Sequence, residues 1–211
     1  MNDPQTVHVI DDNALSLRAA ARLLRASGHA VKTFDSAKEF LAEVSAGATG
    51  CVVTDLDMPG ISGLELQAIL KSAGTTMPVV FLTGRGNIPG SVRAMREGAE
   101  DFLEKRAPKE DLLDAINRAL QRDTEERVAA EEIGRRRARF DILTSREREV
   151  LGHVIRGRQN KEIAAALGLH ERTVKLHRTA IKAKLGVTSV AELMQMVQEA
   201  GWRAPDSLKL A

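Results

Sequence analysis

The chain has 211 residues, enough for one or two domains, because a domain takes about 100–200 residues. Charged residues make up 28% of it, and no apolar run approaches the roughly 18 residues of a membrane span, which predicts a soluble, cytoplasmic protein. A single cysteine, Cys51, excludes a disulfide framework, and an aromatic content of 3% argues against stacking on single-stranded nucleic acid.

Strand and helix signals alternate over residues 6–121. The expected strands are 7–10, 30–34, 51–54, 78–82 and 102–105. The expected helices are 14–26, one opening at the capping box Ser36/Glu39, 63–70, 89–97 and 108–121. In the first helix, Leu15, Ala19, Leu23 and Leu24 recur at helical spacing and predict the buried face. Strands alternating with helices predict a parallel sheet covered by helices on both faces.

Residues 122–139 read differently. The stretch 123–139 holds five acidic and five basic residues, has no sustained apolar stripe, and includes the run Arg135-Arg136-Arg137. It is expected to be a solvated helical linker that continues the preceding helix, although the arginine run also suits contact with phosphate. Charge is divided unevenly on its two sides: residues 1–122 carry 14 Lys and Arg against 16 Asp and Glu, and residues 123–211 carry 17 against 13. The two parts are therefore expected to face different partners.

The last part of the chain, residues 140–202, is expected to be all helical. A capping box, Thr144 with Glu147, opens a helix to about residue 156, and further helices are expected at 161–167, 171–184 and 189–200. A short helix, a turn at Gly168 and a second helix form a helix-turn-helix pattern over residues 160–179. The final Lys209-Leu210-Ala211 is expected to be a cloning scar.

Acidic residues gather at the ends of two predicted strands. Asp11 and Asp12 follow the first strand, and Asp55 and Asp57 follow the third. In an open parallel sheet these two strands can be neighbours, so Asp11, Asp12 and Asp55 would share one crevice. Clustered carboxylates repel one another, and a hard cation such as Mg²⁺ or Mn²⁺ relieves that repulsion.

Two further strand ends point to the same crevice. Thr83 ends the fourth predicted strand with a hydroxyl, and Lys105 ends the fifth with an ammonium group. A carboxylate, a metal ion, a hydroxyl and an ammonium together can hold a transferring phosphoryl group.

Residues 6–121 resemble the receiver domain of bacterial response regulators. The resemblance is carried by Ile10-Asp11-Asp12, Asp55 to Gly60 with Met58-Pro59, then Gly63, Thr83-Gly84 and Phe102 to Lys105. The resemblance implies a flavodoxin-like (βα)5 fold in which Asp55 accepts a phosphoryl group from a sensor histidine kinase. It also implies that Asp11, Asp12, Asp55 and the backbone carbonyl of Asp57 hold Mg²⁺. Thr83 and Lys105 would contact the phosphoryl oxygens, and Phe102 would turn inward when the threonine moves, after which the surface of the fourth helix and fifth strand often dimerises.

One position departs from the receiver pattern. Many receivers follow the lysine with a proline through a cis bond, but here Arg106 follows Lys105. A cis bond without proline costs about 3 kcal/mol, so a trans bond and a different loop are expected.

Two other motifs offer alternatives. Asp55-Leu56-Asp57 also fits the DxD signature of haloacid-dehalogenase-type phosphatases, but Met58-Pro59 follows directly and no later acidic pair is seen. The stretch 83–90 approaches a dinucleotide-binding glycine motif, but its spacing is wrong and a glycine turn is favoured.

The C-terminal motifs resemble the LuxR-type helix-turn-helix domain over about residues 137–202. They include Leu143 to Leu151, Asn160 to Ala164, Thr173 to Arg178 and Lys184 to Val187. Combined with a receiver, this is similar to the FixJ/NarL type of response regulator. The resemblance implies that Lys175, Leu176 and Thr179 face the edges of DNA bases. It implies that Arg172, His177 and Arg178 contact the DNA phosphates or lie beside them. The remaining expected DNA-contacting residues are Asn160, Lys161, Thr173 and Lys182. His170 stands where the family has Ser or Thr as the cap of the recognition helix.

These features predict a cytoplasmic transcription regulator that is not an enzyme. A histidine kinase phosphorylates Asp55 with Mg²⁺, and the phosphorylated protein binds promoter DNA as a homodimer on two half-sites, with RNA polymerase as a candidate partner. Two alternatives stay open, a DNA-binding protein whose receiver works without phosphate and a phosphatase. Replacing Asp55 by Asn separates the three. The kinase, the signal, the promoter and the sign of regulation cannot be derived from the sequence.

Overall fold

The computed structural model describes residues 5–45, 47–75, 77–84 and 88–204. The expected cloning scar at residues 209–211 therefore lies outside the described residues. The chain divides into two compact units, Met1–Val128 and Ala129–Ala211. Each unit is described by itself.

The first unit holds a five-stranded parallel sheet in the order β2-β1-β3-β4-β5. Its strands are β1 (Thr6–Ile10), β2 (Ala30–Phe34), β3 (Gly50–Thr54), β4 (Val79–Thr83) and β5 (Asp101–Glu104). Its helices are α1 (Ala14–Ala26), α2 (Ala37–Glu43), α3 (Gly63–Ser72), α4 (Ile88–Arg96) and α5 (Lys109–Ala138), which runs on into the second unit. The expected alternation and the flavodoxin-like order of strands are confirmed.

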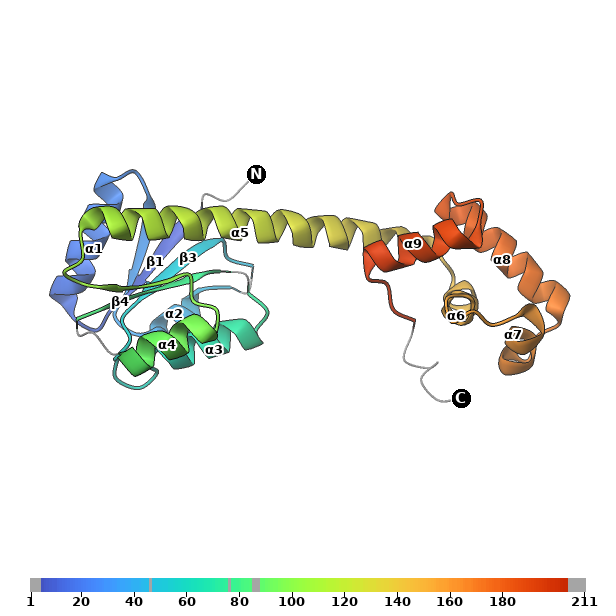
Figure 1. Ribbon diagram of the computed structural model, residues 1–211, viewed down its shortest axis with the longest axis horizontal. Helices are drawn as coiled ribbons and strands as arrows, with labels where there is room; N and C mark the ends of the chain where they lie inside the picture. Colours follow the sequence, from blue (N-terminus) through green and yellow to red (C-terminus); the bar gives the residue numbers. More distant parts are fainter. Residues whose placement is uncertain (1–4, 46, 76, 85–87, 205–211) are drawn as a thin grey trace. The chain divides into compact units, whose positions relative to one another are not determined.

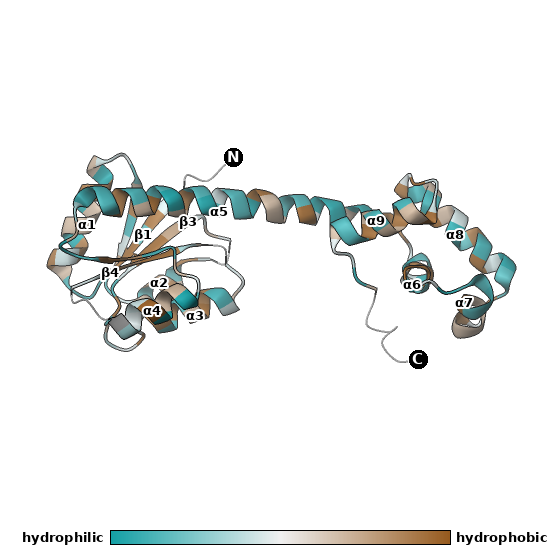
Figure 2. Ribbon diagram, viewed as in Figure 1, coloured by the Kyte–Doolittle hydropathy of each residue, from teal (hydrophilic) through white to brown (hydrophobic). Residues whose placement is uncertain are grey.

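The sheet separates two apolar clusters. Side chains at Val7, Val9 and Val53 pack with α1 and α5, whereas Ile10, Val52 and Phe81 pack with α2, α3 and α4. Figure 1 shows these helices on opposite faces of the strands. Because successive strand residues point to opposite faces, a continuous apolar run such as β3 is buried on both sides. Figure 2 shows the contrast between the brown strands and the mainly teal α5.

The predicted buried face of α1 is half right. Leu24 is buried and Leu23 packs against the core, as predicted, but Leu15 is 73% exposed and Ala19 is exposed as well. Leu17, Ala20 and Ala21 lie on the buried side instead. Leucine and alanine occupy nine of the thirteen positions of this helix, so two different stripes satisfy the helical period. Packing against the sheet selects one of them.

The capping box expected at α2 is only half formed. The Ser36 hydroxyl accepts a hydrogen bond from the Glu39 backbone N–H, but the Glu39 carboxylate accepts from the N–H of Asp35 rather than of Ser36. A complete capping box that the sequence reading passed over opens α3, between Ser62 and Glu65.

Helix α5 is continuous through the expected linker, which confirms that the linker is helical. Asp123 lies in that stretch and is nevertheless completely buried. Its carboxylate accepts hydrogen bonds from the backbone N–H of Gly50 and the amide of Gln5. The fourth turn of α5 is therefore attached to the amino ends of β1 and β3.

The second unit is helical. It consists of the end of α5, a 3-10 turn η1 (Arg139–Ile142), α6 (Ser145–Val154), α7 (Asn160–Leu167), α8 (Glu171–Leu185) and α9 (Val190–Ala200). The expected capping box of Thr144 and Glu147 is present. Phe140 stacks on Trp202 with ring centroids 5.5 Å apart, so Trp202 packs at the end of the domain. Arg137 and Arg139 donate to the backbone carbonyls of Ala200 and Leu185, at the ends of α9 and α8.

Candidate functional site

The acidic crevice forms where β1 and β3 lie side by side. Their register pairs Ile10 with Thr54, so the residues that follow each strand leave the sheet together. Carboxylate oxygens of Asp11, Asp12 and Asp55 all lie within 4.8 Å of one another. Such an all-oxygen set suits a hard divalent cation. The side chain of Asp57 is exposed and outside this group, and the role expected of its backbone carbonyl stays a prediction.

Lys105 reaches into the crevice from the end of β5. Its Nζ lies 2.5 Å from Asp11 Oδ2 and 2.7 Å from Asp55 Oδ2. Burial by itself lowers the pKa of Lys105, but hydrogen bonds and charges from the two aspartates raise it above the ordinary value. The lysine is therefore a fixed positive charge at the most buried part of the acidic group.

Backbone groups orient the two inner carboxylates. Asp55 Oδ1 accepts from the N–H of Leu56 at 2.6 Å, and Asp11 Oδ1 accepts from the N–H of Asn13 at 2.9 Å. The Asp55 side chain keeps 13% of its surface exposed, so one small group can reach it from solvent. With Leu56 on one oxygen and Lys105 on the other, the carboxylate is held in one orientation.

Gly63, which is part of the receiver-like pattern, packs directly against the backbone of Asp55. A Cβ at this position would lie 2.3 Å from the backbone O of Asp55 and 2.9 Å from the Phe81 ring. The Gly63 N–H also donates to the carbonyl of Leu56. The receiver-like pattern included this glycine, but only the packing shows why position 63 must lack a side chain.

Thr83 and Phe102 lie on the neighbouring strands β4 and β5, and Lys105 directly follows β5. Thr83 is buried at the end of β4, and its carbonyl accepts from the N–H of Lys105 at 2.7 Å. Phe102 is half-buried and stacks on Phe81, with centroids 5.9 Å apart. The structure thus gathers Asp11, Asp12, Asp55 and Lys105 in one crevice. Thr83 is joined to this crevice through its backbone bond to Lys105, and Phe102 packs on Phe81 of the neighbouring strand.

The loop after Lys105 has the expected trans bond, since no cis peptide occurs among the described residues. Arg106 is exposed and pairs with Glu104 at 3.3 Å. The dinucleotide-like stretch 83–90 includes residues 85–87, which lie outside the described residues.

In the second unit, α7 and α8 form the predicted helix-turn-helix. Gly168 ends α7 in the left-handed region, with φ +63°, which a residue without Cβ adopts at low cost. Helix α8 begins at Glu171, and the His170 side chain makes no capping hydrogen bond. The start of the recognition helix therefore lacks the side-chain acceptor that Ser or Thr supplies.

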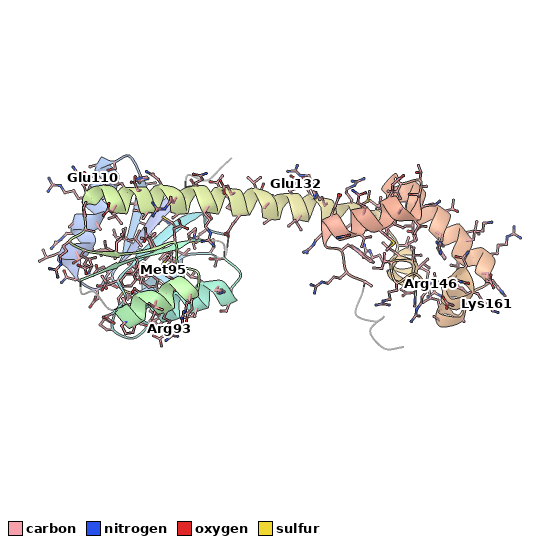
Figure 3. The ribbon with its side chains drawn as sticks, viewed as in Figure 1. Arg93, Met95, Glu110, Glu132, Arg146 and Lys161 are labelled. Carbon is pink, nitrogen blue, oxygen red and sulfur yellow. The ribbon has the colours of Figure 1, made fainter. Side chains whose placement is uncertain are left out.

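The predicted DNA-contacting residues differ in exposure. Exposed side chains are Lys161, Arg172, Lys175, Leu176 and Thr179, and half-buried ones are Asn160, Thr173, His177, Arg178 and Lys182. Arg178 donates to the Asn160 side chain at 3.0 Å, which joins α8 to the start of α7. Lys182 donates to the carbonyl of Thr188. Lys161, labelled in Figure 3, stands near the start of α7.

A hollow of about 580 Å³ brings many of these residues together. Its lining includes the predicted Asn160, Lys161, Lys175, Arg178, Thr179 and Lys182. Gln159, Glu171 and Val190 also line it and were not among the predicted residues. A concave surface with four cationic side chains suits a negatively charged backbone.

Two ion pairs and one hydrogen bond connect residues of α6 to one another, to α7 and to α8. Arg146, labelled in Figure 3, donates to Glu149 at 2.6 Å and to the carbonyl of Leu167. Lys184 contacts Glu147 at 2.7 Å. Burial raises the pKa of Glu147, but the hydrogen bonds from Lys184 and Thr144 together hold it below the ordinary value. The cap of α6 is thus also an attachment point for α8.

Within the described part of the chain, none of the helices combines the length and apolar character that a membrane crossing requires.

Residues 7–117 match the family of response regulator receiver domains, and residues 141–197 match the luxR family of bacterial regulatory proteins. The response regulator protein TmoT of Ectopseudomonas mendocina is 40% identical over 210 residues, covering 99% of this chain and 94% of TmoT. The transcriptional regulatory protein FixJ of Rhizobium meliloti is 40% identical over 201 residues, covering 93% and 97%.

Among solved structures, the response regulator StyR is 44% identical with a TM-score of 0.71, covering 93% of this chain and all of StyR. Full-length FixJ from B. japonicum is 34% identical with a TM-score of 0.54, covering 93% and 97%. The relatives are response regulators and transcriptional regulators, and both family matches coincide with the two sites described above. The chain belongs to the two-component response regulators that join a receiver domain to a LuxR-type helix-turn-helix domain.

Proposed function

We propose that this response regulator accepts a phosphoryl group on Asp55 from a sensor histidine kinase and then binds promoter DNA through α7 and α8. The observation that carries the proposal is the double contact of Lys105 with Asp11 and Asp55, beside the group of three carboxylates. Three adjacent carboxylates and a lysine are a costly arrangement for stability alone, and they match what phosphoryl transfer requires.

Asp11, Asp12, Asp55 and the backbone carbonyl of Asp57 would hold Mg²⁺. The ion, when bound, neutralises charge that develops on the phosphoryl oxygens. A carboxylate oxygen of Asp55 attacks phosphorus, a P–O bond forms, and the P–N bond of the phosphohistidine breaks. The imidazole leaves with the electron pair of that bond and takes up a proton. Lys105 and Thr83 contact the phosphoryl oxygens, and Phe102 moves with Thr83.

On the DNA side, Lys175, Leu176 and Thr179 are proposed to face base edges from α8. Phosphates are proposed to be contacted or flanked by further residues of α8 and by the start of α7. These are Arg172, Thr173, His177, Arg178 and Lys182, with Asn160 and Lys161 of α7. A homodimer would bind two half-sites about 10 base pairs apart, and RNA polymerase would be recruited or obstructed there. We place this action in the cytoplasm, where the promoter DNA is.

The proposed domain limits are 6–121 for the receiver, 122–139 for the linker and 140–202 for the DNA-binding domain. The proposed role involves no turnover of a substrate, so the chain is not proposed to be an enzyme. The DxD alternative would require Asp57 to act as a general acid, and its side chain is exposed and outside the carboxylate group.

The test compares the wild-type chain with Asp55→Asn. Acetyl phosphate and Mg²⁺ should label the wild type and not the variant, and should raise wild-type affinity for a DNA fragment selected on the phosphorylated protein. Light scattering with Mg²⁺ and beryllofluoride should show a shift from monomer to dimer. Equal DNA affinity of both proteins under all conditions would contradict the switch and favour a receiver that works without phosphate.

A further inference from the structure

A series of alternating charges joins β5 to the outer face of α5. Arg118 donates to Asp101 at 2.6 Å, and its Nε lies 3.7 Å from the carboxylate of Glu100. Arg122 lies 3.3 Å from the other oxygen of Glu100 and 2.7 Å from Glu126. These five residues, Glu100, Asp101, Arg118, Arg122 and Glu126, are called the charge ladder below. Each arginine in it is shared between two carboxylates.

The inner end of the ladder lies on the strand that carries the switch residues. Asp101 Oδ1 accepts from the backbone N–H of Phe102 at 2.7 Å, and Lys105 follows the same strand. The Glu100 side chain is only 14% exposed, so this end of the ladder is set into the sheet. A movement of β5 that accompanies phosphorylation therefore moves two of the ladder's carboxylates.

The core-facing side of the same helical segment is attached elsewhere. Asp123, fully buried, accepts from the Gly50 N–H at 3.0 Å and from Gln5 at 3.2 Å. These partners stand at the amino ends of β1 and β3, not on β5. The segment 118–126 of α5 is thus held by hydrogen bonds to one part of the sheet and by ion pairs to another. If β5 moves relative to β1 and β3, the hydrogen bonds and the ion pairs of this segment cannot both keep their geometry, and α5 must shift.

The outer end of the ladder lies beyond the predicted end of the receiver. Glu126 is past residue 121, and α5 continues without interruption to Ala138. An α-helix keeps its backbone hydrogen bonds along its length, so a change of position at residues 118–126 is carried into the following turns.

We propose that the charge ladder transmits the state of Asp55 to α5, with Arg118 and Arg122 as positioning residues. This inference rests on the proposed phosphorylation switch. Coupling between two sites is typically a factor of about 5–150 in affinity, and a single exposed ion pair contributes a factor of about 1.4–5. Several linked pairs can therefore carry a substantial part of the coupling, although no pair alone would.

The test measures a ratio, the DNA affinity with Mg²⁺ and beryllofluoride divided by the affinity without beryllofluoride, on the full chain. The DNA is a fragment selected from random sequence by the beryllofluoride-bound wild type. Arg118→Gln with Arg122→Gln should lower this ratio by about fivefold or more and leave beryllofluoride affinity unchanged. Hydrogen exchange should respond to beryllofluoride at residues 122–136 of the wild type and not of the variant.

Two matched variants separate charge from packing. Arg118→Lys with Arg122→Lys retains the charges and should keep most of the ratio. Lys32→Gln removes a comparably exposed ion pair with Glu43, at 3.6 Å, and should leave the ratio unchanged. Because the two arginines of the ladder are about half exposed, the wild-type ratio should also fall as salt rises, when exposed charges are screened.

The proposed role of the ladder would be contradicted if the glutamine double variant kept the wild-type affinity ratio and the wild-type hydrogen-exchange response of α5. A wild-type ratio of one would instead overturn the proposed switch and this inference with it. If the double variant does not fold, Glu100→Gln removes the carboxylate shared by both arginines, and the same loss of ratio is expected.

Discussion

The proposed phosphoryl pocket (Asp11, Asp12, Asp55 and Lys105) and the proposed DNA-facing surface (α7 and α8) are built from the chain in opposite ways. The pocket joins residues from separate strand ends, so that Lys105 meets Asp55 across 50 positions of sequence. The DNA-facing surface comes from two consecutive helices, and its inner contact, Arg178 to Asn160, spans 18 positions. A pocket assembled over long separations depends on the register of the whole sheet, whereas the helix pair depends mainly on its own caps and turn.

The two regions also differ in what their polar groups contact. In the pocket, Lys105 is paired with both Asp11 and Asp55, and all three side chains are largely buried. On α8, Lys175 and Leu176 face solvent, with Leu176 64% exposed. Substitutions in the pocket should therefore change its chemistry and its stability together, whereas substitutions on the exposed face of α8 should change binding with little effect on folding.

The largest expected effect is that of Lys105→Met. Loss of the ammonium that contacts both aspartates should slow phosphoryl uptake from acetyl phosphate about 100-fold, as for removal of one preorganised donor at a developing charge. DNA affinity of the unphosphorylated chain should be unaffected. The control is Lys109→Met, an exposed lysine at the start of α5. Equal uptake rates in the two variants would show that Lys105 does not take part in the transfer.

A pair of glycine substitutions sharpens the contrast between long-range and local structure. Gly63→Ala places a methyl group against the Asp55 carbonyl and should lower the free energy of unfolding by about 1–3 kcal/mol. Gly134 lies in α5, and a Cβ added there would have nothing within 4 Å. Gly134→Ala should therefore raise the free energy of unfolding by about 0.5–1 kcal/mol. Urea denaturation of both variants measures the signs. If Gly134→Ala instead destabilised the protein, the added methyl group would have to meet a neighbour that is absent from this structure.

The start of α8 offers a purely local test. His170→Ser supplies a hydroxyl acceptor where the histidine makes no cap bond, and should stabilise the second unit by about 1 kcal/mol. Ser189→Ala removes the hydroxyl that accepts from Glu192 at the start of α9, and should cost a similar amount. Thermal unfolding of the full chain follows both. No change in the first variant would mean that water already satisfies the start of α8.

The smallest effect concerns pH, and each unit carries one buried histidine. Burial lowers the pKa of His8, with a further contribution from Lys32, and burial also lowers the pKa of His153, helped by Arg158 and Arg156. Folding therefore favours the neutral rings. Their contribution is complete above the unfolded pKa of about 6.5 and is lost as pH falls through the folded value.

Urea denaturation between pH 7.5 and 5.5 measures this loss. His153→Gln should flatten the acid dependence of the second unit and leave that of the first unit unchanged. His8→Asn should do the reverse. A variant that retains the slope of the wild type in its own unit would place the titrating group elsewhere.

Much of the site could be predicted because its residue types are tied to element ends. Asp11, Asp12, Asp55, Thr83 and Lys105 follow strands, and the carboxyl ends of parallel strands meet at one edge whatever the details of packing. The predicted buried face of α1 was wrong at Leu15 and Ala19, and the receiver-like pattern included Gly63 without showing what it packs against. In both cases several arrangements satisfy the local pattern, and only contact with a distant segment distinguishes them.

By itself, the sequence determined the order of strands and helices, the helix-turn-helix, the capping box at Thr144 and the type of chemistry at the strand ends. Caps, turns and periodicity depend on residues a few positions apart, so they can be predicted from the sequence. The tertiary structure alone decided that Lys105 bridges two aspartates, that Asp123 is buried and that charges link β5 to α5. These contacts join segments separated by tens of residues, and their existence depends on the distance and burial that packing creates.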